Sequence, residues 1–139
     1  MSADAMTPAA IVEAYLAAHM IPDPVAASAF VAPEFEITFT GGRKMKEPAE
    51  ASAFNARRYK WVKKRIERTE TVAGGSLDDT VVYSLGTLYG EWPDGTPFEG
   101  NRYIDRFVVR HGKIIAQSVW NDSAEILLDR AGLAPHDRL

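Results

Sequence analysis

The chain has 139 residues, a net charge of -3 and no cysteine. This length predicts a single domain over residues 1–139 that can bury about two-thirds of its unfolded surface without crosslinks. The negative charge argues against nucleic acid as a partner, and the lack of cysteine excludes disulfides, thiolate zinc sites and a cysteine nucleophile.

Targeting and metal signals are also missing from the sequence. No apolar run approaches the roughly 18 residues of a membrane span. The first twenty residues carry acidic side chains rather than the basic start of a secretory leader. We therefore expect no membrane partner and a cytoplasmic location. His19, His111 and His136 share no ligand spacing, so no metal site is expected.

One stretch of the chain is locally basic. Residues 57–68 hold seven lysines and arginines around Tyr59 and Trp61, which is a composition that suits a basic surface with an aromatic platform. Glu67 and Glu70 interrupt the run of positive charge, and such alternation is typical of a solvated helix end and edge strand. We favour the solvated surface and keep a surface for an acidic partner as an alternative.

Start and stop signals define the expected elements. Thr7 before Pro8 is an N-cap with proline at the first helical position, and apolar residues then recur at helical spacing to about residue 20. Asp23-Pro24 opens a second, short helix. The remaining expected elements are a strand Phe35–Thr40, a helix from Pro48 to about Arg58, strands Trp61–Val72, Val81–Trp92, Phe98–Arg110 and Ile114–Asn121, and a helix Ser123–Ala131.

This order of elements predicts an α+β fold. Three N-terminal helices would pack on one face of a curved antiparallel sheet, and a short helix would end the chain. Gly86, Gly90 and Gly100 lie inside strands, where glycine permits bulges or sharp bends. A bent sheet under helices can enclose a pocket.

The most informative residue is Asp105, a carboxylate in the middle of a strand. Strand residues alternate faces, so its side chain points the same way as Tyr103 and Phe107, which are typical core residues. An ionised carboxylate is expensive to bury there, so it must be paired, protonated or turned toward a ligand cavity. Pairing with a neighbouring strand and a ligand-facing role both remain open.

The final part of the chain resembles a known family. The segments YIDRF (residues 103–107), HGKI (111–114) and VWND (119–122) are similar to the last two strands and terminal segment of the nuclear transport factor 2-like superfamily. The SnoaL-like and ketosteroid-isomerase-like families are the nearest in pattern, and the element order agrees over nearly the whole chain. The resemblance implies a cone-shaped fold with an apolar cavity, a homodimer and no cofactor, but this superfold hosts unrelated functions.

The resemblance also implies site residues. Asp105 falls where the isomerases keep an oxyanion-stabilising aspartic acid, and Tyr15 falls where they keep the oxyanion tyrosine. Such an acid, held neutral by an apolar site, donates a hydrogen bond. Together the two groups would bind a carbonyl oxygen as it gains negative charge. Asp122 falls where SnoaL-like cyclases and limonene epoxide hydrolases use an aspartate for acid–base work, although it could instead cap the following helix.

Two departures from the family patterns limit the activity. The isomerase general base position falls on or near Thr38, which cannot accept a proton as a carboxylate does, and Glu36 is the nearest acid. The central strand at residues 81–89 carries no charge, whereas the epoxide hydrolases use an arginine and an aspartate there. Steroid isomerisation and epoxide hydrolysis are therefore not expected.

The register of the last hairpin decides which residues share a face. A two-residue loop at residues 111–112 places Asp105 opposite Ser118 and on the same face as Trp120 and Asp122. The two aspartates would then lie roughly 13 Å apart, too far to share a proton. The expected lining residues of the pocket are Trp120, Tyr103, Phe39, Phe107 and Ser118.

We consider two functional hypotheses from the sequence. The first is acid–base chemistry of isomerase, cyclase or dehydratase type, without metal or cofactor, on a hydrophobic carbonyl compound. Asp105 and Tyr15 would polarise the oxygen and Asp122 would transfer a proton. The second is a non-catalytic ligand-binding or dimerisation module of the same fold, which the missing carboxylate at Thr38 favours.

Overall fold

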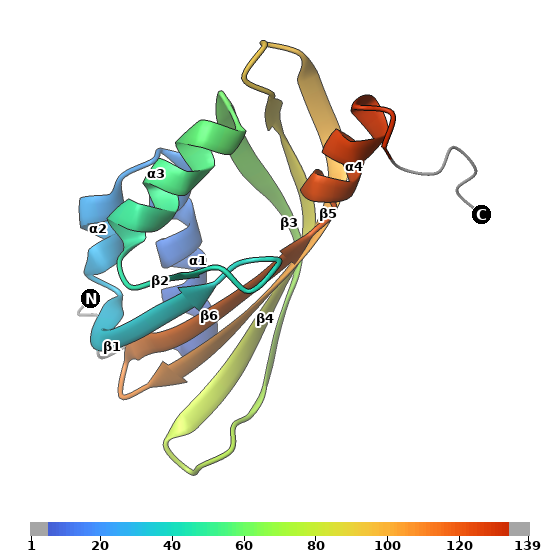
Figure 1. The fold of residues 1–139 in the computed structure, drawn as a ribbon. Helices are drawn as coiled ribbons and strands as arrows, with labels where there is room; N and C mark the ends of the chain where they lie inside the picture. The colour runs from blue at the N-terminus through green and yellow to red at the C-terminus, as the bar shows by residue number, and fades with distance from the viewer. Residues whose placement is uncertain (1–5, 134–139) are drawn as a thin grey trace.

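The computed structural model describes residues 6–133. The elements in chain order are α1 (Pro8–Met20), α2 (Pro24–Ser28), β1 (Val31–Thr38), β2 (Lys44–Met45), α3 (Pro48–Arg58), β3 (Trp61–Ala73), β4 (Asp79–Glu91), β5 (Pro97–Arg110), β6 (Lys113–Asn121) and α4 (Ser123–Arg130). In Figure 1, α1, α2 and α3 lie together on one side of the sheet, while α4 lies apart from them beyond the end of β6. The α+β class is confirmed. The three-helix N-terminal part is confirmed only in part, because α2 has just 5 residues.

The predicted helix starts are confirmed by their capping bonds. Thr7 Oγ1 accepts a hydrogen bond from Ala10 N at 3.1 Å, and Asp23 Oδ1 accepts one from Ala26 N at 3.0 Å. Each bond satisfies one of the amides that a helix leaves free in its first turn. These caps fix where α1 and α2 begin, and so how Tyr15 is presented to the sheet.

The sheet is mixed, which corrects the expectation of a wholly antiparallel sheet. Its strand order is β2-β1-β6-β5-β4-β3. β1 pairs in parallel with β6, while every other neighbouring pair is antiparallel. β1 also begins at Val31, earlier than the predicted Phe35, and the two-residue β2 was not predicted. Alternation identifies a strand but not its partner or direction, so the pattern alone could not show the parallel pair.

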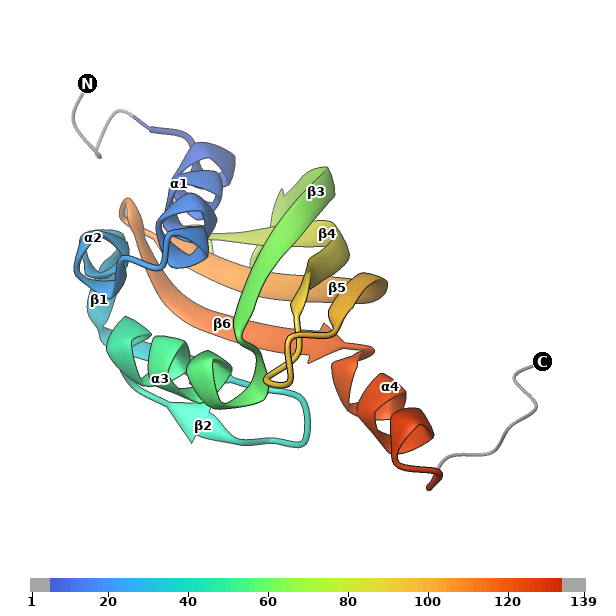
Figure 2. The ribbon, with the colours of Figure 1, turned by 90° about the horizontal axis from the view of Figure 1, so that it is seen from above.

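Bulges at glycines bend the long strands. Gly100 has a φ of +82°, and the pairing of β4 with β5 shifts register where residue 100 is skipped. Opposite Gly86 the pairing of β3 with β4 shifts as well, and a Cβ on Gly86 would lie 2.0 Å from the Arg65 carbonyl oxygen. The predicted bends at these two glycines are confirmed. Seen from above, the strands curve along their length and β3 packs beside α1 (Figure 2).

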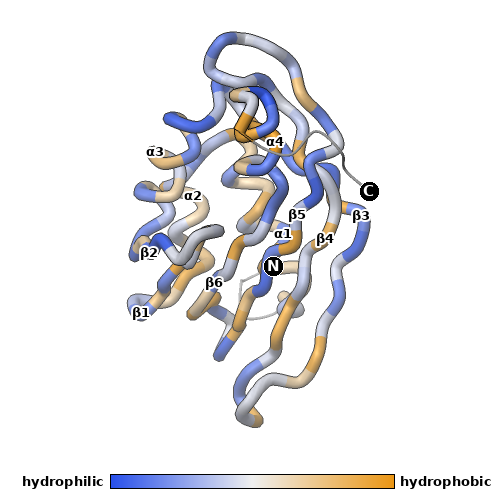
Figure 3. Tube along the Cα trace, turned by 45° about the vertical axis from the view of Figure 1, so that its right-hand side comes forward, coloured by the Kyte–Doolittle hydropathy of each residue, from blue (hydrophilic) through white to orange (hydrophobic). Residues whose placement is uncertain are grey.

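The hydrophobic core lies between the helices and the inner face of the sheet. Orange and blue segments alternate along β5 in Figure 3, as expected for a strand with one buried face. Inward residues of β5 are buried and their neighbours are only partly buried. From the helices, the core receives the fully buried Ile11, Val12 and Tyr15 of α1 and Ala51 of α3. Among residues 6–133, no helix is long and apolar enough to cross a membrane.

Candidate functional site

A cavity in two adjoining parts lies under α1 and α3. The inner chamber has a volume of about 60 Å³, and its wall includes Tyr15, Phe39, Asp105 and Gln117. The outer chamber has a volume of about 380 Å³ and extends past the end of α1 to Ile21 and Trp61. Both chambers are lined by His19, Asn55, Tyr59 and Val62. A molecule in the outer chamber therefore lies against the same side chains that border the inner one.

Asp105 lies on the wall of the inner chamber and is completely buried. Neither of its carboxylate oxygens has a hydrogen-bond partner among the described residues. Lys64 Nζ, from β3, lies 3.6 Å from Oδ2 and keeps 22% of its own side chain exposed. Burial raises the pKa of the Asp105 carboxyl, and Lys64 and Gln117 offset only part of that rise. The environment therefore favours the protonated acid.

Lys64, on β3, is the partner for Asp105 that the pairing hypothesis requires. Its ammonium also lies 4.9 Å from the centre of the Tyr103 ring. At 3.6 Å the contact with Asp105 is a loose ion pair rather than a hydrogen bond. Because Lys64 reaches solvent and Asp105 does not, the buried carboxyl bears most of the desolvation penalty.

Tyr15 meets the sheet through Gln117. The Tyr15 hydroxyl donates a hydrogen bond to Gln117 Oε1 at 2.8 Å, and both side chains are buried. Burial, followed by the nearby Asp105 carboxylate, raises the pKa of the Tyr15 phenol far above its usual range. The bond turns the Gln117 amide nitrogen away from Tyr15, and the amide acts on the neighbouring Asp105 carboxyl, whose pKa it lowers in part. The structure thus brings Tyr15 and Asp105 to one chamber, with Gln117 beside both.

His19 is the site residue that the sequence analysis missed. It lies one turn after Tyr15 on α1, and the two rings meet edge to face with centroids 4.6 Å apart. Its Nδ1 lies 3.5 Å from Ser52 Oγ, while its Nε2 is buried without a hydrogen-bond partner among residues 6–133. Burial, followed by the positive charge of Lys64, lowers the pKa of His19 from 6.5 to about 4. The ring is therefore neutral at physiological pH. The i to i+4 spacing from Tyr15 was the available signal.

Three predicted lining residues lie on the inner face with Asp105. Phe39 borders the inner chamber. Phe107 is fully buried behind Tyr15, with ring centroids 5.8 Å apart. The Tyr103 hydroxyl lies 2.8 Å from Ser84 Oγ and is hydrogen-bonded to it. Burial raises the pKa of Tyr103 to about 12, with Ser84 acting in the opposite direction. Only Phe39 of the three reaches the chamber, and the other two support its wall.

The predicted hairpin register is wrong beyond the turn. The loop does pair Arg110 with Lys113, but a bulge between Val108 and Val109 leaves Ile115 without a partner on β5. One extra residue moves every later side chain to the opposite face. Asp105 therefore lies opposite Val119 instead of Ser118, and the residues turned inward are Gln117, Val119 and Asn121.

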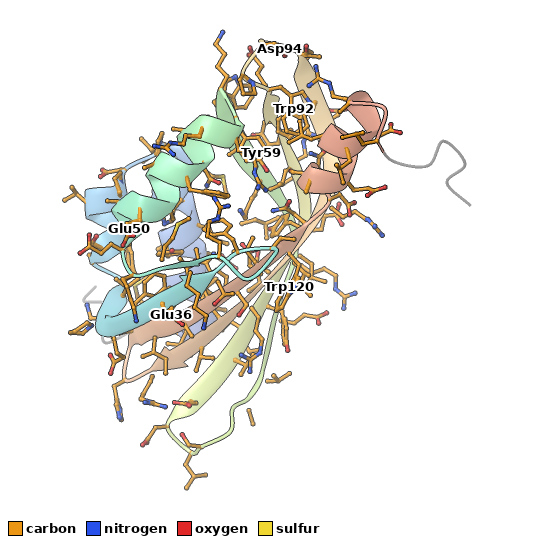
Figure 4. All side chains as sticks on the ribbon, viewed as in Figure 1. Glu36, Glu50, Tyr59, Trp92, Asp94 and Trp120 are labelled. Carbon is orange, nitrogen blue, oxygen red and sulfur yellow. The ribbon has the colours of Figure 1, made fainter. Side chains whose placement is uncertain are left out.

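The same shift removes three predicted residues from the cavity. Ser118 pairs with Arg106 on the outer face. Trp120 is 49% exposed, and Figure 4 shows it on β6, far from Tyr59 and Trp92. Asp122 is held by Arg102, whose Nε lies 2.7 Å and Nη2 3.1 Å from its carboxylate oxygens. Asp122 does stand at the N-cap position of α4, where its backbone oxygen accepts from Ile126 N at 3.0 Å, but its side chain makes no capping bond.

The inner face of β1 provides no base. Its inward residues are Phe35 and Ile37, and Phe39 follows just after the strand, whereas Thr38 points outward. Glu36 lies on the surface, where its two oxygens contact Lys44 and Lys46 at 3.1 and 3.0 Å. No carboxylate on this strand therefore faces the cavity, either at Thr38 or beside it.

The far wall of the cavity is rigidly built. Tyr59, at the end of α3, stacks on Trp92 with ring centroids 5.6 Å apart, and its hydroxyl donates to Ser123 Oγ at 2.6 Å. Figure 4 shows both rings in the space between α3 and α4. These contacts tie α3 to the β4–β5 hairpin and hold one side of both chambers in place.

The basic stretch of the sequence runs along this cavity, and Lys60, Trp61 and Lys63 border its outer chamber. In the basic stretch, Lys60 pairs with Glu91 and Arg65 with Glu99, which supports a solvated edge strand. No three potential metal ligands gather within residues 6–133, and His136 lies outside that range. A larger recess, of about 640 Å³, is an open groove beside α3 that includes Arg43 and Phe54. It contains no buried ionisable group, so we place the candidate site in the smaller cavity.

Comparisons with known proteins identify the fold. No family model and no curated protein sequence matches the chain. A nuclear transport factor 2-like protein from Burkholderia thailandensis matches with a TM-score of 0.69 at 24% identity, covering 94% of this chain and 99% of its own. A hypothetical protein with a ketosteroid isomerase-like fold from Catenulispora acidiphila, in complex with trimethylamine, has a TM-score of 0.66 at 22% identity, with 96% and 99% covered.

A putative polyketide cyclase from Pseudomonas putida also matches, with a TM-score of 0.60 at 18% identity, over 83% of this chain and 91% of its own. The chain therefore has the nuclear transport factor 2-like fold that the sequence resemblance implied. At these identities the likeness establishes the fold alone, because one fold of this kind carries many activities.

Proposed function

We propose that this protein binds a hydrophobic carbonyl compound under α1 and α3 and performs acid–base chemistry on it, of isomerase, cyclase or dehydratase type. Asp105 carries the proposal: it is completely buried on the wall of a chamber, and neither oxygen has a hydrogen-bond partner among residues 6–133. A buried polar group in that state costs free energy that a core would normally avoid. A ligand oxygen that accepts a hydrogen bond from the protonated acid would remove the cost.

The groups around the inner chamber suit an oxygen that gains negative charge. Asp105 donates directly when protonated, and Gln117 offers amide N–H groups whose direction is set by the bond from Tyr15. Lys64 adds a positive charge 3.6 Å from Asp105. Fixed donors in a site without bulk water stabilise a developing oxyanion strongly. In this arrangement Tyr15 acts on the oxygen through Gln117 instead of touching it.

The proposed ligand occupies both chambers. The inner chamber of about 60 Å³ has the volume of about two water molecules, so it admits only the reacting end, a carbonyl group and the carbon beside it. The outer chamber of about 380 Å³ holds the rest, which is within the usual range for small-molecule sites. Phe39 forms part of the apolar wall, with Tyr103 and Phe107 behind. Ser118, Trp120 and Asp122 lie outside the proposed site.

The proposal is tested with 2-tetralone, a hydrophobic ketone whose α-hydrogens exchange with solvent through an enolate. We expect it to shift the amide resonances of Tyr15, Asp105 and Gln117, and to exchange its α-hydrogens in D₂O faster with the protein present. Asp105→Ala removes one oxyanion donor, so the exchange rate should fall by about 10²–10³-fold. Asp78→Asn, in the exposed turn before β4, is the matched control and should keep the full rate. An unchanged rate in Asp105→Ala would refute the role of Asp105.

A non-catalytic binding module is the second candidate. It is favoured by the inner face of β1, which presents Phe35 and Ile37 and no carboxylate. The same experiment separates the two candidates. Binding of 2-tetralone without any acceleration of exchange would support the binding module over the catalyst.

The homodimer implied by the resemblance is part of the proposal. Trp120 is 49% exposed on the outer face, and its cross-strand neighbour there is Ile104. An exposed tryptophan beside a β-branched residue on a sheet face is a suitable centre for an isologous contact. Sedimentation should give a dimer for the native protein and a monomer for Trp120→Lys. A native monomer at high protein concentration would refute this part.

A further inference from the structure

His19 has a buried nitrogen that nothing in the fold uses. Its Nε2 is inaccessible to solvent and has no hydrogen-bond partner among residues 6–133. The ring borders both the inner and the outer chamber, so it stands where the two parts of a bound molecule would meet. A buried ring nitrogen without a partner is rare in folded proteins and calls for an explanation.

One of the two neutral tautomers of the ring leaves Nε2 free to accept a proton. Ser52 Oγ, on α3, lies 3.5 Å from Nδ1, and no such neighbour faces Nε2. The tautomer with its hydrogen on Nδ1 directs that hydrogen to Ser52 and leaves the lone pair on Nε2. The edge-to-face contact with Tyr15, at 4.6 Å between centroids, holds the plane of the ring.

The charged and titratable groups around His19 come from several elements. Tyr15 lies on its own helix, Lys64 on β3 and Asp105 on β5, all on the wall of the inner chamber. α3 contributes the uncharged Ser52 and Asn55, and Tyr59 at its end borders both chambers. Lys60 and Lys63 border the outer chamber, which His19 also lines. Burial and Lys64 both disfavour the imidazolium, so the ring remains in its proton-accepting form over the whole physiological range.

We propose that His19 Nε2 is the proton acceptor of this cavity, the base that β1 does not supply. It takes a proton from the carbon beside the substrate carbonyl. The C–H bond breaks, its electron pair forms the C=C bond of the enolate, and the negative charge moves to the carbonyl oxygen facing Asp105 and Gln117. In a β,γ-unsaturated substrate the enolate is conjugated, and return of the same proton from Nε2 to the γ carbon shifts the double bond and completes an isomerisation. No oxidant, metal or co-reactant is required.

The charges of the intermediate account for a weak base in this position. In the empty cavity an imidazolium beside Lys64 is unfavourable. Once the proton has moved, the imidazolium faces an enolate in a site of low dielectric, and attraction between opposite charges is much stronger there than in water. The enolate also gains from Lys64. The protonated state of His19 is thus stabilised mainly while the intermediate exists.

The test rests on the proposed function and uses the full chain with 2-tetralone. His19→Gln keeps a side chain of similar length that cannot take up the proton. We expect it to bind 2-tetralone, judged by the shifts at Asp105 and Gln117, but to exchange the α-hydrogens about 10²–10⁴-fold more slowly. His111→Asn, at the exposed turn between β5 and β6, is the control and should behave as the native protein. The native exchange rate should fall as the pH drops toward about 4, where His19 takes up a proton.

A second measurement avoids any variant. Binding of 4-nitrophenolate, an oxyanion that mimics the enolate, should raise the pKa of His19 as followed by NMR of the native ring. Binding of 2-tetralone with undiminished exchange in His19→Gln would overturn this inference and leave the proposed function intact. A pKa of His19 that 4-nitrophenolate leaves unchanged would overturn it too. Failure of 2-tetralone to bind the native protein would overturn both proposals.

Discussion

Acid should destabilise this fold through His19. Burial, followed by the positive charge of Lys64, lowers the pKa of the imidazole from 6.5 to about 4. In the unfolded chain the ring takes up a proton near its ordinary pKa of 6.5, whereas in the folded chain it takes up a proton near its lowered pKa of about 4. Between these values the unfolded state binds more protons. The stabilisation is therefore fully present above pH 6.5 and is lost as the pH falls through about 4.

The size of the effect follows from the two pKa values. Each pKa unit of difference between folded and unfolded chains is worth about 1.4 kcal/mol, so the gap between 6.5 and about 4 corresponds to ~3 kcal/mol. That is a large part of the stability of an ordinary domain, which is about 5–15 kcal/mol.

Urea unfolding followed by circular dichroism measures this loss. The free energy of unfolding is compared for the native protein, His19→Gln and His111→Asn from about pH 7.5 to about pH 4. The comparison is valid where the m-value is the same for all three proteins at each pH. Carboxylates contribute to all three proteins alike, so the difference between curves isolates His19. The native protein and His111→Asn should lose ~3 kcal/mol more than His19→Gln. Parallel curves for the native protein and His19→Gln would refute the reasoning.

Three further predictions concern stability. Tyr15→Phe leaves Gln117 Oε1 buried without its donor and should lower the free energy of unfolding by about 1–3 kcal/mol in urea; no loss would contradict the bond. Gly86→Ala forces a Cβ to 2.0 Å from a backbone oxygen and should cost about 1–3 kcal/mol or more, whereas Gly75→Ala, with open space around it, should leave the melting temperature nearly unchanged. Burial raises the pKa of the Asp105 carboxyl. The stability of the native protein is therefore unaffected by this group below pH 3.8 and falls as the pH rises through the raised pKa. Asp105→Asn should be more stable than the native protein at neutral pH, by about 1.4 kcal/mol per pKa unit, and equally stable in acid.

Much of the fold could be predicted because local signals were strong. The caps at Thr7 and Asp23 and the alternation along β5 each determine an element from a few neighbouring residues. The parallel pairing of β1 with β6 could not be predicted in this way, because a strand's partner depends on contacts between residues far apart in sequence. The resemblance in the last third of the chain supplied the architecture that local patterns could not.

The candidate site was predicted in part. Asp105 and Tyr15 do reach one chamber, because each lies in an element whose pattern was clear. Gln117 was missed because one bulged residue, Ile115, reverses the faces of β6 after it, and bulges leave little trace in a hydrophobic pattern. His19 was weighed only as a metal ligand. Its spacing from Tyr15 indicates that the two rings are neighbours on α1, but spacing along one helix does not show that they border a cavity.

The state of Asp105 tests the central claim most directly. NMR of the carboxyl carbon of Asp105, recorded as the pH is varied in the native protein without ligand, gives its pKa in the folded chain. The account predicts a value well above the ordinary 3.8, because burial outweighs the loose contact with Lys64. A pKa at or below 3.8 would contradict it, since Asp105 would then be an ionised structural partner of Lys64 with no hydrogen to donate.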